Sequence, residues 1–178
     1  MKIITNNLPK EVELPLYIAS TQFPELSGTK IEVKYANIKT TMACRPKSSS
    51  IFHSRNNRTY LLLLNNNKGK QKVTLFEELP IEEQIGILSH ELSHICDYQN
   101  KSMLHIVFNG IGYFFHSYRR KFEHKVDMIA IGHGFGWQLY YLRDYLLNRS
   151  DIQPAYKNYI RNIYMIPETI KTKINLQY

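Results

Sequence analysis

The sequence predicts an α+β fold, with a small sheet in the first half of the chain and helices in the second half. Three observations lead to this prediction. Short apolar runs with strand-like patterns fall between residues 30 and 76. After Pro80, apolar residues recur at the three- and four-residue steps of helices. Strands that precede helices, without alternating with them, are typical of α+β proteins. We expect a mostly antiparallel sheet over residues about 30–76, packed on the helices.

The first half of the chain contains one predicted helix and three predicted strands. Residues 11–23 form the helix despite Pro15, because three apolar residues share one face: Val12, Leu16 and Ala19. Residues 30–38 alternate as a strand whose inward residues are Ile31, Val33 and Tyr35. Residues 60–64 are an apolar run typical of a strand buried on both sides, and residues 72–76 predict a further strand. Between these strands, residues 44–57 look like a loop.

The second half of the chain is predicted to be helical. Apolar spacing indicates five helices, over residues 80–99, 103–116, 118–131, 135–147 and 154–165. Gly132, Gly134 and Gly136 are expected to break or kink the chain between the third and the fourth of them.

Composition sets limits on the class of protein. A chain of 178 residues with 43% hydrophobic residues predicts one domain, residues 1–178, with a substantial core. Two cysteines, Cys44 and Cys96, are too few for a disulfide framework, and residues 1–7 reach polar residues too early for a secretory leader. We therefore expect a cytoplasmic protein without a transmembrane segment. The oligomeric state stays open.

The net charge of +8 is compatible with nucleic-acid binding but does not favour it. The basic residues are scattered, and the densest run, residues 119–121, is more typical of a solvated face. The most apolar window, residues 103–115, has two interpretations. It is a buried connector between helices, or it is a mobile or membrane-touching segment above the functional site.

The most informative motif is His90-Glu91-Leu92-Ser93-His94, an H-E-x-x-H sequence inside the helix predicted for residues 80–99. Residues four apart share a face of a helix, so both imidazoles can bind one metal ion. Glu91 can then reach a water molecule held by that ion. The alternative is a pair of partly buried histidines that hydrogen bonds satisfy.

A catalytic zinc ion usually has a third protein ligand. Glu123 and Asp127 lie four residues apart in the helix predicted over residues 118–131, beside its apolar stripe. Two carboxylates in these positions repel each other unless a cation or a hydrogen-bond donor separates them. A metal ion bound by Glu123, with Asp127 accepting a hydrogen bond from a ligand histidine, resolves this repulsion.

These two motifs resemble the pattern of the gluzincins, the thermolysin-like branch of the zincin metallopeptidases. The resemblance covers residues 80–100 and 118–131. It implies a zincin core with a Zn²⁺ site between two helices. It further implies that His90, His94 and Glu123 are the zinc ligands, that Glu91 is the general base, and that Asp127 orients a ligand histidine.

Two other residues compete for the third ligand position. SprT-like proteases, which are associated with DNA, use a histidine there, so His124 is an alternative to Glu123. Asp97 lies one turn after His94 and can bind metal or cap the helix. The metzincin pattern does not fit, because Asp97 and Asn100 occupy the positions where it requires glycine and a third ligand.

The resemblance implies hydrolysis of peptide bonds in a peptide or protein substrate by metal-activated water. Gluzincins also supply a histidine or tyrosine to the oxyanion, and His133, Tyr140 and Tyr141 are candidates by position. In zincins the edge strand beside the cleft pairs with substrate, a role that we expect for residues 58–66. Two alternatives remain: hydrolysis of another amide or ester, and a zinc-containing binding or regulatory domain without activity.

Overall fold

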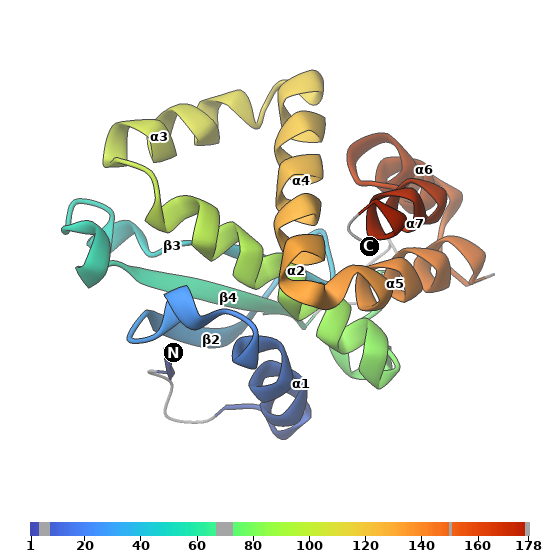
Figure 1. The fold of residues 1–178 in the computed structure, drawn as a ribbon, viewed down its shortest axis with the longest axis horizontal. Helices are drawn as coiled ribbons and strands as arrows, with labels where there is room; N and C mark the ends of the chain where they lie inside the picture. The colour runs from blue at the N-terminus through green and yellow to red at the C-terminus, as the bar shows by residue number, and fades with distance from the viewer. Residues whose placement is uncertain (4–7, 67–72, 150, 177–178) are drawn as a thin grey trace.

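The computed structural model describes residues 1–3, 8–66, 73–149 and 151–176. Its sheet has four strands in the order β1-β2-β4-β3. Their bounds are β1 Lys2–Ile3, β2 Lys30–Ala36, β3 Met42–Pro46 and β4 Thr59–Asn65. The seven α-helices are α1 Lys10–Thr21, α2 Ile81–Gln99, α3 Met103–Gly112, α4 His116–Ala130, α5 Gly136–Asn148, α6 Pro154–Ile163 and α7 Pro167–Asn175. The predicted α+β class is confirmed, because the sheet comes almost entirely before the long helical part (Figure 1).

The sheet is mixed, so the prediction of a mostly antiparallel sheet was wrong. Among the described residues, β2 pairs in parallel with both β1 and β4, and only β3 pairs antiparallel with β4. The parallel pairing was missed because β3 was not predicted: its last three residues fall in the predicted loop 44–57. Once β3 is recognised, the connection from β2 to β4 is long enough for the chain to return in the same direction.

The apolar strand β4 lies in the middle of the sheet, between β2 and β3. All its residues are buried, as its unbroken apolar sequence predicts, but the prediction that residues 58–66 form the edge strand beside the cleft was wrong. The edge strand beside the cleft is β3, and Pro46 ends it at a position where an edge strand tolerates proline. Residues 72–76 were predicted to form a further strand. Residue 72 lies outside the described residues, residues 73–76 form no strand, and Phe76–Glu78 form a 3₁₀ helix.

Helix α2 lies at the centre of the molecule and positions the site. It starts after Pro80, with Glu82 and Glu83 in the first turn, where acidic residues interact favourably with the helix dipole. Every residue from Gln84 to Asp97 is buried. The helix packs against α1, α4, α5 and β3, and Figure 1 shows it between the sheet and the other helices.

The helices predicted from apolar spacing are confirmed with small shifts of their ends, and α7 was missed. The glycine series does bend the chain: residues Ile131–Phe135 form a π-helical turn between α4 and α5, and Gly134 adopts φ +86°, which favours glycine. Gly136 permits a close approach, since a β-carbon there would lie 2.5 Å from Ile174. Along β2, Ile31 and Val33 are buried as predicted, whereas Tyr35 is 45% exposed.

Helix α3 does not form the buried connector that its apolar sequence favoured. Of its residues, all of which the structure describes, Ile106 alone is buried, and the helix extends away from the sheet (Figure 1). No helix in the described part of the chain is both long and apolar enough to cross a lipid bilayer.

Candidate metal centre

Helix α2 places His90, Glu91 and His94 in the interior of the molecule. All three are at most 7% exposed. The two imidazole rings lie one helical turn apart, with centroids separated by 4.9 Å and planes nearly perpendicular. Because the helix is already buried by its neighbours, the two rings are held in place before any ion binds.

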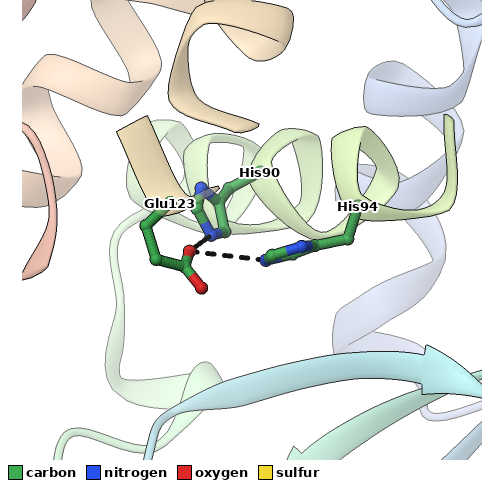
Figure 2. A group of neighbouring side chains, drawn as sticks. All are labelled: His90, His94 and Glu123. Atoms are coloured by element: carbon green, nitrogen blue, oxygen red, sulfur yellow. Dashed lines mark ion pairs between the residues drawn. The ribbon is translucent and has the colours of Figure 1, made fainter. Parts of the chain in front are cut away.

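Helix α4 brings Glu123 to the same point. Its Oε2 atom lies 3.1 Å from Nε2 of His90 and 3.5 Å from Nε2 of His94, as Figure 2 shows. The side chain of Glu123 is fully buried. The structure therefore brings together the three side chains that the sequence predicts as ligands, and their ligand atoms all lie within 4.8 Å of one another.

The spacing of these atoms fits a small tetrahedral metal ion. Ligand atoms at about 2.0–2.1 Å from a tetrahedral zinc ion lie about 3.3 Å apart, and the separations of 3.1 and 3.5 Å bracket this value. Two histidines and one glutamate are also a known ligand set of catalytic zinc, which leaves a position open. Among the described residues, the buried Oε2 atom of Glu91 and Nδ1 of His94 have no hydrogen-bond partner. The donor set and the unpaired oxygen of Glu91 therefore fit a cation.

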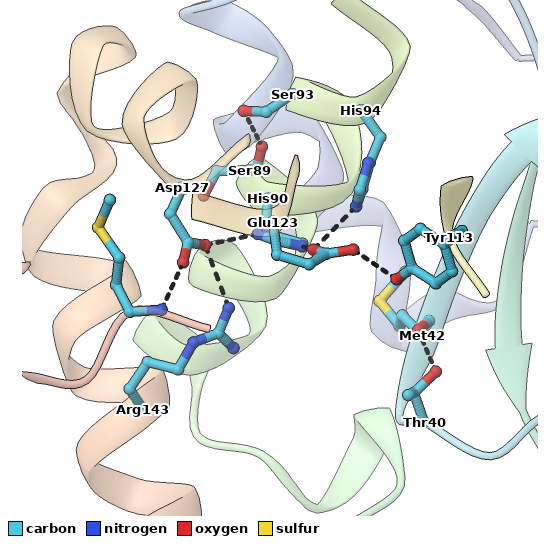
Figure 3. A network of polar contacts seen from close by, with 11 residues as sticks. Thr40, Met42, Ser89, His90, Ser93, His94, Tyr113, Glu123, Asp127 and Arg143 are labelled. Atoms are coloured by element: carbon cyan, nitrogen blue, oxygen red, sulfur yellow. Dashed lines mark hydrogen bonds and ion pairs between the residues drawn. The ribbon is translucent and has the colours of Figure 1, made fainter. Parts of the chain in front are cut away.

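Asp127 holds His90 from the side opposite Glu123. Its Oδ1 atom lies 2.8 Å from Nδ1 of His90 and accepts a further bond from Arg143 at 3.2 Å, while Oδ2 accepts one from the backbone N–H of Met165 at 3.0 Å. Figure 3 shows Asp127 between His90 and Arg143. Because the carboxylate accepts at Nδ1, the Nε2 atom of His90 is the one available to a metal ion.

The protonation of this group depends on the charges gathered in it. Burial alone would raise the pKa of Glu123, but His94 and His90 hold that pKa well below its usual range. Burial also opposes ionisation of Asp127, yet Arg143 and His90 lower its pKa. For His90, burial favours the neutral form, but the hydrogen bonds to Asp127 and Glu123 prevail and raise its pKa to about 10. Without a metal ion, a protonated His90 therefore supplies the positive charge between two carboxylates.

Glu91 points into a cleft of about 480 Å³ that also contains His94 and Glu123. The whole edge strand β3, from Met42 to Pro46, lines the same cleft. Burial raises the pKa of Glu91, although the neighbouring His94 and His90 oppose this effect. A carboxyl group whose pKa is raised is better suited to accept and return a proton.

The cleft contains tyrosines that the sequence did not single out: Tyr98, Tyr113, Tyr159 and Tyr164. The hydroxyl of Tyr113 donates to Oε1 of Glu123, the carboxylate oxygen that does not face the histidines. The ring of Tyr164 meets His90 edge-on at 5.6 Å and lies under the guanidinium of Arg143 at 4.2 Å. Tyr113 comes after α3 and Tyr164 after α6, so no local spacing related them to the H-E-x-x-H motif.

The residues predicted to stabilise the oxyanion lie outside the cleft. His133 is stacked on Phe23 and contacts Glu25 through Nε2, at 2.8 Å, and the backbone oxygen of Ile129 through Nδ1. Tyr140 packs edge-on against Trp137 and Tyr141 on the outer part of α5. His133, Tyr140 and Tyr141 are not among the described residues that line the cleft.

The two competing third ligands are also away from the histidine pair. Asp97 accepts from Lys101 and Lys125, each at 2.6 Å, and these bonds occupy both of its oxygens. In the part of the chain that the structure describes, the one group able to hold a metal ion is His90, His94 and Glu123, and His124 does not belong to it.

Comparisons of the chain with protein-family models, with curated proteins and with solved structures gave no match. Any assignment of function therefore depends on the residues and the geometry described above.

Proposed function

We propose that this protein is a zinc-dependent metallopeptidase of the gluzincin type. The observation that supports the proposal is the convergence of His90, His94 and Glu123 beside Glu91 in an open cleft. A structural zinc site would need a fourth protein ligand and would have no use for a carboxylate base. Three ligands, a base and a cleft together are the requirements of a hydrolytic centre.

Each side chain has a distinct role in the proposed reaction. His90, His94 and Glu123 would hold the ion, which would supply a Lewis acid that lowers the pKa of a water molecule. Glu91 would accept the proton of the water that attacks the peptide carbonyl and would deliver it to the leaving amine. Asp127 keeps His90 in the orientation and tautomer required of a ligand, and Arg143 fixes Asp127.

The substrate is proposed to bind along β3. This strand pairs with β4 along one edge and lines the cleft, so its other edge can pair with an extended peptide through main-chain hydrogen bonds. Such pairing places a peptide bond across the cleft with little dependence on side chains. It also assigns to β3 the role that the sequence had suggested for residues 58–66.

Tyr164 is the proposed donor to the oxyanion, in place of His133 or Tyr140. It lines the cleft together with Glu91 and contacts the ring of His90. Burial raises its pKa well above the usual value, so the phenol keeps its proton at neutral pH and can donate a hydrogen bond.

The proposal is tested by metal analysis and peptide cleavage. Protein purified without a metal-affinity tag should contain one zinc ion per chain and cleave members of a broad peptide library. Glu91→Gln should retain the ion and lose at least about a hundredfold in kcat, because the proton acceptor of the reaction is missing. His90→Ala should lose both the ion and the activity.

A matched control is Glu83→Gln, which changes a carboxylate of the same helix outside the cleft and should leave both properties unchanged. Bound zinc without cleavage of any peptide would reject the peptidase. Cleavage of ester or other amide substrates would then indicate a different hydrolase, and absence of all hydrolysis would indicate a zinc-containing binding domain. Protein that binds no divalent metal would reject every version of the proposal.

A further inference from the structure

Helix α3 and the turn that follows it expose an unusually apolar surface. Six large apolar side chains of residues 104–115 are between 46% and 85% exposed: Leu104, Val107, Phe108, Ile111, Phe114 and Phe115. Phe114 is the most exposed of them, at 85%. Isolated exposed apolar residues are ordinary, but a group of this size on consecutive turns is typical of a binding surface. We call these six residues the α3 apolar surface.

The apolar character of this segment is not explained by packing within the chain. In α3, Ile106 alone is buried, although the helix is the most apolar of the described helices. A helix with this composition normally covers a core. Here the large apolar side chains are exposed, and Figure 1 shows α3 on the outer side of the molecule, apart from α1 and α5. Something outside the described chain is needed to cover it.

All the Lys, Arg, Asp and Glu residues in the stretch of chain that carries the α3 apolar surface are basic. No aspartate or glutamate occurs from Tyr98 to Phe122, whereas the same stretch contains Lys101, Arg119, Arg120 and Lys121. Lys101 is paired with Asp97, and Arg119 donates to the backbone oxygen of Tyr113. Arg120 and Lys121 are exposed and form no ion pair with a described carboxylate. They therefore add positive charge to the first turns of α4, the helix that follows the exposed aromatic residues in the chain.

We propose that the α3 apolar surface and the adjacent basic residues dock on an anionic lipid bilayer. Exposed Leu and Phe residues next to Lys and Arg, without acidic residues, are the features of a helix that lies in the membrane interface. The apolar side chains enter the boundary between headgroups and acyl chains, and the cations contact the negatively charged headgroups.

A second copy of the chain is a less suitable partner. Each copy carries a net charge of +8, and a symmetric contact through α3 would bring two sets of unpaired cations together with no acidic residue to neutralise them. An anionic bilayer can cover the apolar residues and also pair with the cations. A neutral bilayer or a second copy of the chain can cover the apolar residues but leaves the cations without negative partners.

Membrane docking would bring the cleft close to the bilayer. Four residues of the same stretch, residues 104–115, also line the cleft: Ile106, Asn109, Gly110 and Tyr113. If the proposed peptidase activity is correct, its substrates include peptides at the membrane surface. The docking itself requires no metal ion and no activity, so the two proposals fail or succeed separately.

Vesicle flotation tests the inference with the intact protein. The protein should float with vesicles of phosphatidylcholine that contain about one quarter phosphatidylglycerol, and not with pure phosphatidylcholine. Phe108→Ser with Phe114→Ser should reduce binding at least about tenfold. Arg120→Gln with Lys121→Gln should reduce it about 25-fold, because each cation near the surface contributes about a factor of five. All four residues are exposed, so circular dichroism should remain unchanged.

Matched controls separate docking from general attraction of a basic protein. Leu14→Ser with Tyr17→Ser removes exposed apolar residues from α1, and Lys10→Gln with Lys171→Gln removes two exposed cations elsewhere; both pairs should bind as the unchanged protein does. The proposal is overturned if anionic vesicles are not bound, or if the phenylalanine and control pairs bind equally. It is also overturned if the unchanged protein is a dimer in gel filtration and the double phenylalanine variant is a monomer that still binds vesicles as the unchanged protein does.

Discussion

At the scale of single residues, Asp127 connects the proposed ligands to the rest of the site. One of its oxygens lies between His90 and Arg143, and the other accepts the backbone N–H of Met165. The side chain is completely buried. Asp127 therefore fixes the ring of His90 without being a metal ligand itself.

Replacement of this residue gives a direct prediction. Asp127→Asn keeps the shape of the side chain but removes its charge, so Nδ1 of His90 loses a charged acceptor. We expect zinc affinity to fall about 10- to 100-fold, the usual effect of losing a partner of a ligand histidine. Competition with a chromophoric chelator measures this change. Asp144→Asn on α5, whose carboxylate contacts Asn148, is the control, and equal affinities for the two variants would contradict the role of Asp127.

The site residues that can be predicted from the sequence are those related by helical spacing. His90 and His94 are four apart, and so are Glu123 and Asp127, so the spacing alone assigns each pair to one face of a helix. Arg143 and Tyr164 carry no such relation to the motif. They reach the site because α5 packs on α2 and because the chain returns after α6. Long-range packing of this kind has no local pattern from which it could be predicted.

At the scale of elements, the contact between α2 and α5 depends on Gly86. A β-carbon at this position would lie 2.3 Å from the backbone oxygen of Gln138, so the two helices touch through their backbones. A side chain cannot be accommodated unless α5 moves. Since Arg143 also lies on α5, this packing fixes one partner of Asp127.

We therefore expect Gly86→Ala to destabilise the protein by about 2–4 kcal/mol, because overpacking against backbone leaves no flexible side chain to yield. Urea unfolding followed by circular dichroism measures the change. Gly110→Ala is the matched control in another helix: a β-carbon there meets no atom within 4 Å, so we expect no loss or a gain of about 0.5–1 kcal/mol. If both variants were equally stable, the close contact between α2 and α5 would be wrong.

Elements are predicted well where their apolar spacing is regular and poorly where it is not. The buried strand β4 and the helices before α7 have clear patterns, and their positions were expected. Strand β3 lacks such a pattern, since Met42–Pro46 contains a charged residue and ends in proline at the edge of the sheet. Missing it led to the wrong prediction of a mostly antiparallel sheet. Helix α7 was missed for another reason: Pro167 starts it after a short extended segment, and proline can mark the first position of a helix as well as a break.

At the scale of the whole molecule, the candidate metal centre joins segments from distant parts of the chain. His90 and His94 come from α2 and Glu123 from α4, while Asp127 adds contacts to α5 and to the segment before α7. These contacts exist together only in the folded chain. An ion that binds the folded state and not the unfolded state stabilises the whole fold in proportion to the logarithm of its concentration over Kd.

This coupling should depend on pH in a defined direction. The pKa of His90 is about 10 in the metal-free protein, against 6.5 for an ordinary histidine, so its ion pairs stabilise the fold below pH 6.5 and this contribution is lost as the pH rises through 10. Metal binding requires the unprotonated ring and therefore releases a proton, so the binding free energy should improve by about 1.4 kcal/mol per pH unit between about pH 7 and 9.

Thermal unfolding with and without a fixed zinc concentration tests this argument. The zinc-induced increase in Tm should be larger at about pH 8.5 than at about pH 7, because each ion displaces the proton on His90 more easily as the pH rises. Glu123→Gln should show little increase at either pH, since the ligand charge is removed while the fold around α4 is retained. A zinc-induced increase of the same size at both pH values would mean that His90 is neutral before the ion binds, and that the two carboxylates beside it do not hold a proton on its ring.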